Sequence, residues 1–132
     1  MNRVKFSYSP YNVNAMTQAA GAAAISDEAY FADVTAKVIA ARTRTTAELR
    51  RRGFTVFDSA TNFLFTPTDR MPCVEIFATL RARGILIRHF NAPRISDYLR
   101  ITIGTPEQMR RFFAALDEIL GEYMPSPQRI TP

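Results

Sequence analysis

The stretch DYLRITIGTPEQ, residues 97–108, decides the fold class of this chain. Its first half alternates apolar and polar residues, which is typical of a strand with one buried face. Thr105–Gln108 then predicts the start of a helix, because threonine and glutamine three positions apart form a capping box and Pro106 suits the first helical position. Arg100 lies inside the strand, either as a solvated outer-face residue or as a ligand for an anion.

Further strands and helices are predicted on both sides of this stretch. Runs rich in Phe, Val and Ile predict strands at 54–58, 62–66 and 85–89, in addition to 98–103. Capping residues and apolar spacings of three and four predict helices over 15–25, 27–52, 73–83 and 106–120. This order predicts an α+β fold, with a small, mostly antiparallel sheet and helices packed on one face of it.

The apolar spacing also predicts which side of each helix is buried. The three predicted buried faces are Phe31, Val34, Val38, Ala41, Thr45 and Leu49; Val74, Phe77 and Leu80; and Met109, Phe112, Phe113, Leu116, Ile119 and Leu120. Gly53 and Gly84 follow the first two of these helices as stop signals.

Composition limits the classes of function. The 132 residues carry a formal net charge of +5, and only Lys5 and Lys37 among the 17 basic residues are lysines. The arginines are spread along the chain and no aromatic RNA-recognition motif accompanies them, so a nucleic-acid partner is not expected. No apolar run is long enough to cross a membrane. The single cysteine, Cys73, predicts a reducing, cytoplasmic location. One cysteine and one histidine, His89, are too few for a zinc site of the Cys/His type, so none is expected.

Four stretches carry a family resemblance: PYNVN (10–14), ATNFLF (60–65), RGILIRHF (83–90) and DYLRITIGTPEQ (97–108). In order and spacing they resemble the C-terminal small domain of fold-type I aminotransferases, which depend on pyridoxal phosphate (PLP), and most of all the histidinol-phosphate aminotransferases. The most specific part is the pair GILIR and YLRITIGT. The resemblance implies three regions: an extended interdomain arm at 1–13, the small domain at 14–124, and an irregular tail at 125–132.

The resemblance also implies roles for individual residues. Arg100 would bind the substrate α-carboxylate, because a planar guanidinium makes two parallel hydrogen bonds to a carboxylate. Arg88 would bind the substrate phosphate. Asn62 would contact substrate near the hinge, although a structural role in a turn is an equal alternative. Tyr11 and Asn12 would lie at the hinge or at an interface. No catalytic, cofactor-binding or metal-binding residue is predicted.

The chain departs from the family in one chemical respect. In the family, a large domain supplies the lysine that binds PLP, in a Ser-Lys motif, and neither Lys5 nor Lys37 stands in such a context. PLP is therefore the cofactor implied for the parent enzyme, and this chain alone is expected to bind none and to be inactive. The chain would supply substrate-binding arginines for amino transfer between histidinol phosphate and 2-oxoglutarate. The alternative is a stand-alone, non-catalytic binding module that keeps the fold.

Two further expectations concern partners and the remaining reactive side chains. Without its large domain, the chain would expose the Ala-rich helix 15–25 and the aromatic residues Phe6, Tyr8 and Tyr11. Large apolar patches are uncommon on monomers, so self-association as a homodimer through residues 1–25 is expected. His89 and Cys73 are expected to be structural.

Overall fold

The computed structural model describes residues 13–123, and it divides the chain into two compact units, residues 1–36 and 37–132. The predicted arm, except for Val13, and the predicted tail lie outside the described residues, so the limits proposed for the small domain stay predictions. Helix α2 (Ala15–Ser26) lies in the first unit and begins at Asn14 as expected, because the Asn14 side chain accepts a hydrogen bond from the Thr17 N–H at 2.9 Å.

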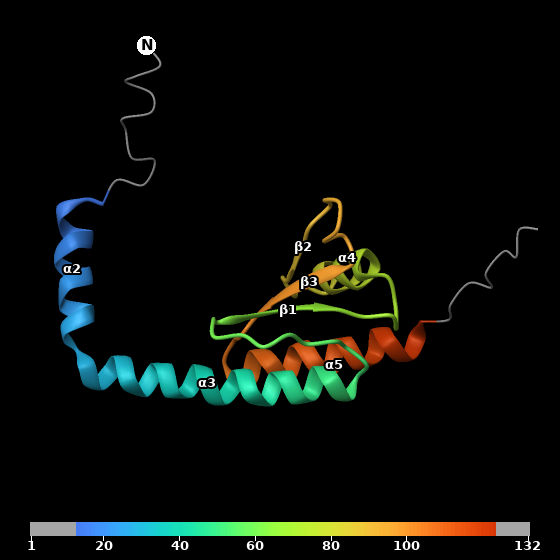
Figure 1. The fold of residues 1–132 in the computed structure, drawn as a ribbon, viewed down its shortest axis with the longest axis horizontal. Coiled ribbons are helices and arrows are strands. Elements are labelled where there is room, and N and C mark those ends of the chain that lie inside the picture. Colours follow the sequence, from blue (N-terminus) through green and yellow to red (C-terminus); the bar gives the residue numbers. More distant parts are fainter. Residues whose placement is uncertain (1–12, 124–132) are drawn as a thin grey trace, which may run out of the picture. The chain divides into compact units, whose positions relative to one another are not determined.

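A three-stranded antiparallel sheet forms the centre of the second unit (Figure 1). Its strands are β1 (Phe63–Pro67), β2 (Arg88–His89) and β3 (Tyr98–Thr102), in the spatial order β1-β3-β2. The core face of the sheet consists of Leu64, Thr66, Leu99 and Ile101, each no more than 2% exposed. Leu64 lies opposite Ile101, and Thr66 lies opposite Leu99, so the four side chains share one side of the sheet.

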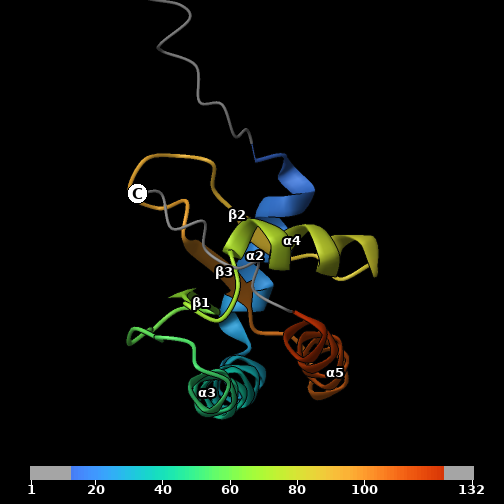
Figure 2. The same cartoon turned by 90° about the vertical axis from the view of Figure 1, so that its right-hand side faces the viewer.

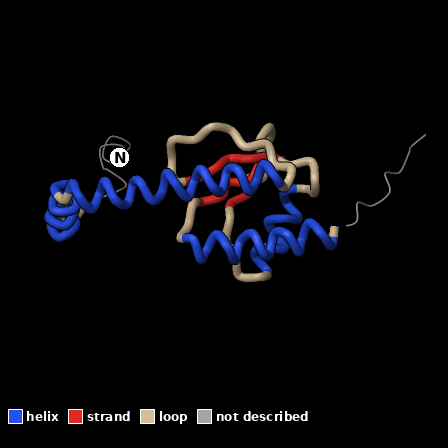
Figure 3. The backbone as a smooth tube through the Cα atoms, turned by 90° about the horizontal axis from the view of Figure 1, so that it is seen from below, coloured by secondary structure: helices blue, strands red, loops and turns tan. Residues whose placement is uncertain are grey.

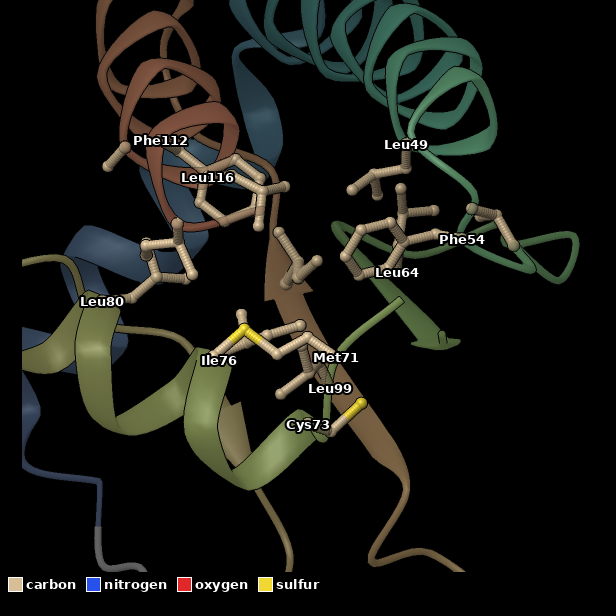
Figure 4. Packing of buried hydrophobic residues seen from close by; sticks show 14 of the residues in the cluster. Leu49, Phe54, Leu64, Met71, Cys73, Ile76, Leu80, Leu99, Phe112 and Leu116 are labelled. Carbon is tan, nitrogen blue, oxygen red and sulfur yellow. The ribbon is translucent and has the colours of Figure 1, made fainter. Parts of the chain in front are cut away.

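Within the described part of the second unit, the helices lie on the core face of the sheet (Figure 2). They are the part of α3 (Glu28–Arg51) that belongs to the second unit, α4 (Cys73–Ala82) and α5 (Pro106–Glu122). Their apolar side chains meet those of the sheet in one cluster, whose labelled members in Figure 4 are Leu49, Phe54, Leu64, Met71, Cys73, Ile76, Leu80, Leu99, Phe112 and Leu116. The predicted α+β class, with helices on one face, is confirmed.

The C-terminal end of α3 is linked to α5 by charged hydrogen bonds as well as by packing. Figure 3 shows the C-terminal part of α3 running alongside α5, and in that view α3 passes in front of the strands. Arg52, directly after α3, donates to both carboxylate oxygens of Asp117 on α5, at 2.6 and 2.8 Å, and its guanidinium lies over the Phe113 ring at 4.5 Å. A bidentate pair of this kind fixes orientation as well as distance, so Arg52 holds α3 in register with α5.

One predicted strand is absent, and another is shorter than predicted. Residues 54–58 form no strand, and only Phe54 makes an isolated bridge, to Thr68. The Val56 carbonyl accepts a hydrogen bond from the Arg50 guanidinium at 2.9 Å. A side chain therefore satisfies a backbone acceptor that would otherwise pair with a neighbouring strand. The predicted strand 85–89 is reduced to Arg88–His89.

The predicted helix faces are correct for α5 and wrong in part for the other two helices. On α3 the described burial begins near Ala41, while Phe31 and Val34 are 65% and 36% exposed, because the described core lies against the C-terminal half only. On α4 the buried side chains are Cys73, Ile76 and Leu80, and Val74 is exposed. Cys73, Ile76 and Leu80 are spaced three and four residues apart and so share one side of α4, and that side packs into the core cluster.

The remaining local predictions agree with the structure. The capping box of α5 is complete: the Gln108 N–H donates to Thr105 Oγ1 at 3.3 Å, and the Thr105 N–H donates to Gln108 Oε1 at 2.8 Å. Gly53 and Gly84 have φ angles of 85° and 74°, the left-handed conformation that glycine adopts after a helix. Within residues 13–123, no helix combines the length and the hydropathy of a membrane span.

Candidate functional site

The opposite side of the sheet carries the two arginines that the sequence singled out. We call this side the arginine face and define it by Phe63, Phe65, Arg88, Tyr98 and Arg100. On β3, Leu99 and Ile101 point to the core, so Arg100 between them points away from it. Arg100 lies directly opposite Phe65 of β1 on one side and Arg88 of β2 on the other. The fold therefore places Arg88 and Arg100 directly opposite each other on the neighbouring strands β2 and β3.

This placement puts two positive charges beside each other. Directly opposed residues of antiparallel strands have Cβ atoms about 5 Å apart, and like charges in that position destabilise the pair. Among the described residues, no carboxylate forms an ion pair with either arginine. Two adjacent guanidinium groups without a counter-charge form a favourable site for a phosphate or a carboxylate.

Each of the two guanidinium groups lies over the face of an aromatic ring. The guanidinium carbon of Arg100 lies 5.3 Å from the centre of the Phe63 ring, and that of Arg88 lies 5.0 Å from the centre of the Phe90 ring. Cations at this distance from a ring face are attracted to it. The Arg100 Nε is buried and has no hydrogen-bond partner within the described part of the chain. The site therefore retains unused donor capacity.

These aromatic residues were missed by the sequence analysis. Phe65 and Tyr98 stack with ring centres 4.7 Å apart and 12° between the planes, next to Arg100. The alternation in NFLFT already placed Phe63 and Phe65 on one side of a strand. The missing information was the register, which puts that side next to Arg100 rather than next to Leu99.

Asn62 is not brought to the two arginines. It directly precedes β1, and its backbone carbonyl accepts a hydrogen bond from the Ile103 N–H at 2.8 Å. Strand alternation puts position 62 on the same side as Leu64, which is the core face. The predicted contact of Asn62 with substrate therefore gains no support from its position, whereas its pairing with Ile103 supports the structural alternative.

Cys73 and His89 lie together at the other end of the sheet, around a cavity of about 330 Å³. The Cys73 thiol donates to the Asp97 carbonyl at 3.0 Å, and burial raises the pKa of that thiol, which disfavours the nucleophilic thiolate. His89 Nε2 lies 2.6 Å from the Ser96 carbonyl. Both side chains fasten the loop between β2 and β3, as their predicted structural role requires.

Among the described residues, no lysine lies in a site that fits PLP chemistry. A PLP enzyme needs an enclosed lysine amine, and Lys37, which lies on α3, is exposed and lines none of the described cavities. Lys5 lies outside the described residues. In residues 13–123, no three His, Cys, Asp or Glu side chains gather in a way that could hold a metal ion.

Comparisons with known proteins bear on the family. The model of the aminotransferase class I and II family matches residues 1–116. Histidinol-phosphate aminotransferase 2 of Rhizobium meliloti is 44% identical over 120 residues, which is 91% of this chain and 34% of that protein. Histidinol-phosphate aminotransferase 1 of Bradyrhizobium diazoefficiens is 42% identical over the same share of each chain. The chain thus spans about a third of the length of these relatives.

Solved structures show the same fold. The histidinol-phosphate aminotransferase of Clostridium acetobutylicum superposes with a TM-score of 0.78 at 22% identity, over 92% of this chain and 38% of that one. The Sinorhizobium meliloti enzyme, in complex with pyridoxal-5'-phosphate, gives a TM-score of 0.69 at 28% identity, over 75% and 28%. Because the family model matches most of the chain, the protein belongs to the class I and II aminotransferase family.

Proposed function

We propose that this chain is the substrate-anion-binding part of an aminotransferase that transfers an amino group between histidinol phosphate and 2-oxoglutarate. The observation that carries the proposal is the cross-strand pair of Arg88 and Arg100, two uncompensated guanidinium groups on the arginine face. The names of the relatives support the substrate class. The large domain that completes such an enzyme is the proposed partner, and a cytoplasmic location is proposed with it.

The two arginines divide the work according to the chemistry of the substrates. The fork of Arg100, at the centre of the sheet, suits a planar carboxylate such as that of 2-oxoglutarate. Arg88, on the short edge strand β2, suits the phosphate of histidinol phosphate. PLP, when bound in the complete enzyme, would supply the electron sink for amino transfer. The residues of this chain would contribute binding and orientation of the substrate to that reaction.

A chimera of the Rhizobium meliloti relative tests this division. This chain replaces the matched 120 residues of that enzyme, and amino transfer is measured with both substrates. Arg88→Gln is expected to raise the KM for histidinol phosphate about tenfold or more and to affect 2-oxoglutarate less, because a charge-assisted hydrogen bond contributes roughly 1.5–3 kcal/mol. Arg100→Gln is expected to show the reverse preference. Arg81→Gln, at an exposed position on α4, is the control. Equal effects of all three variants would refute the proposal.

The chain by itself is proposed to carry no PLP-dependent activity. Incubation of the full chain with PLP, followed by borohydride reduction and mass spectrometry, is expected to give no stoichiometric adduct. A stoichiometric adduct on Lys5 or Lys37 would contradict this proposal.

We also propose that the isolated chain forms a two-fold homodimer through residues 1–25. Support comes from the first unit, where every described residue is exposed, including Met16 at 84% and Ile25 at 81%. Apolar surface of this extent favours burial against a second copy. Size-exclusion chromatography with light scattering would compare the full chain with a version lacking residues 1–13. A full chain that runs as a monomer at tens of micromolar would contradict the dimer.

A further inference from the structure

A cavity opens where β2 parts from β3. The register that puts Arg88 opposite Arg100 would continue to Leu86 opposite Thr102 and to Ile85 opposite Ile103, but the ladder ends at Arg88. A cavity of about 390 Å³ lies at this point. Its lining includes the apolar side chains of Ile85, Ile87, Ile103, Met109 and Phe112, together with Gln108 and Arg111.

Both rims of this gap carry unpaired backbone groups. The Ile103 N–H donates to the Asn62 carbonyl on the β1 side. In an antiparallel sheet, successive residues direct their N–H and C=O groups to opposite neighbours, so Thr102 directs its groups toward Leu86. A closed ladder would join Thr102 and Leu86 by two hydrogen bonds, and within residues 13–123 neither residue makes a backbone bond across the gap. Unpaired strand edges of this kind accept a further strand.

The side chains of the parted segment also have the pattern of a strand. Ile85 and Ile87 are half-buried, and Leu86 between them is 80% exposed. This alternation is typical of a strand that packs on one side. The exposed Leu86 side chain next to an apolar cavity leaves apolar surface that an added segment would bury.

The charge beside the gap is positive and uncompensated. Arg111 lines the cavity and forms no ion pair within the described part of the chain, whereas its neighbour Arg110 pairs with Glu107. The N-terminus of α5 adds the positive end of a helix dipole. Within residues 13–123, the Gly104 N–H there donates only to the sulfur of Met109, at 3.4 Å, which is a weak acceptor. An acidic group on the incoming segment would match this environment.

We propose that this gap is a docking site for one extended segment of a partner polypeptide, which corresponds to the part of the relatives outside the 34% that this chain matches. The segment adds a strand against Thr102, places apolar side chains among Ile85, Ile103 and Phe112, and directs a carboxylate to Arg111. Backbone pairing supplies affinity and the alternating side chains supply specificity. The inference rests on the partner proposed above, and it does not depend on the roles assigned to Arg88 and Arg100.

Hydrogen exchange at two amides tests the proposal. The full chain is measured alone and after co-expression with the Rhizobium meliloti relative from which the matched 120 residues have been deleted. The amides of Leu86 and Thr102 are expected to exchange rapidly in the chain alone and at least a hundredfold more slowly in the complex. Slow exchange of both amides in the chain alone would overturn the proposal, because the gap would then be closed or filled by the chain itself or by a second copy.

Two variants at one position separate docking from folding. Thr102→Pro removes the N–H that faces the gap and keeps the ladder to β1, because the groups of residue 102 face away from β1. Thr102→Val keeps the N–H and is the matched control. The proline variant is expected to lose at least tenfold in partner affinity while its thermal unfolding stays close to that of the valine variant. Equal affinities of the two variants would overturn the proposal.

Charge reversal and a covalent chimera complete the test. Arg111→Glu is expected to weaken the complex, and Arg110→Glu is expected to weaken it less, because Arg110 already has a partner. If the complement does not co-purify with this chain, the same two amides are measured in the chimera described above. Exchange in the chimera as rapid as in the isolated chain would overturn the proposal.

Discussion

The two faces of one small sheet differ in whether they are complete. The core face finds all its partners within the chain: Leu64, Leu99 and Ile101 are almost fully buried against the helices. The arginine face has cations without anions and a buried Arg100 Nε without a partner in the described residues. Residues of the two faces alternate along the same strands, so neighbouring positions in sequence serve stability and binding separately.

This difference has a practical consequence for mutagenesis. A substitution at Leu99 should change the free energy of unfolding, and one at Arg100 should change anion binding, although the two residues are adjacent. The stability predictions below, from the largest expected effect to the smallest, either separate the two faces or show that they are coupled.

Truncation of a core-face side chain is expected to have the largest effect on stability. Leu99→Ala should lower the free energy of unfolding by about 3 kcal/mol, since it removes buried methyl groups and leaves a cavity. Urea denaturation followed by circular dichroism measures this change. A loss below about 1 kcal/mol would show that the core face collapses around the vacancy.

Loss of the Arg52–Asp117 pair between α3 and α5 is expected to have an intermediate effect on stability that depends on pH. Arg52→Ala should cost about 1–2 kcal/mol at neutral pH, because bidentate charged hydrogen bonds are lost from a pair whose carboxylate side is exposed. The Arg52 guanidinium lowers the pKa of both Asp117 and Glu48, with help from Arg51 at Glu48.

The sign of the pH dependence follows from these lowered pKa values. A carboxyl group with a lower pKa in the folded state adds stability above its unfolded pKa, and this contribution is lost as the pH falls through the folded value. The difference between the wild type and Arg52→Ala should therefore shrink below about pH 4. Thermal unfolding of both proteins between pH 7 and pH 3 measures it. A difference that stays constant with pH would assign the effect of Arg52 to its packing on Phe113.

A buried hydroxyl on the core face should contribute less. Thr66 is fully buried, and its Oγ1 donates to the Thr55 carbonyl at 2.8 Å, which fastens the segment before β1 to the sheet. Thr66→Val keeps the shape of the side chain and leaves that carbonyl without its donor, so a loss of about 1 kcal/mol is expected. Thr66→Ser, which keeps the donor, is the control in the same thermal unfolding experiment. A larger loss for the serine variant would show that the methyl group matters more than the hydrogen bond.

The arginine face should contribute least to stability. Arg100→Gln is expected to change the free energy of unfolding by no more than about 0.5 kcal/mol, and in the stabilising direction, because it removes one of two opposed like charges. The same urea experiment measures this. A loss as large as that of Leu99→Ala would mean that Arg100 is a structural residue, and it would contradict the division between the two faces.

Local sequence determined where several helices begin and end and which side of α5 is buried. The capping box of Thr105 and Gln108, the glycine stops after α3 and α4, and the inward face of α5 were all correct, because each depends on residues within a few positions of one another. The alternation around Arg100 likewise placed it away from Leu99 and Ile101. The resemblance in the motifs of residues 83–108 predicted the family that the comparisons then showed.

Only the tertiary structure decided which strands pair and how far. Residues 54–58 have strand propensity, yet Arg50 occupies the carbonyl of Val56, and a propensity argument has no access to such a contact. The apolar stripe of α3 continues to Phe31, but burial depends on what lies against it. The opposition of Arg88 to Arg100 and the parting of Leu86 from Thr102 are both matters of register. Register joins residues distant in sequence, so no local pattern could have supplied it.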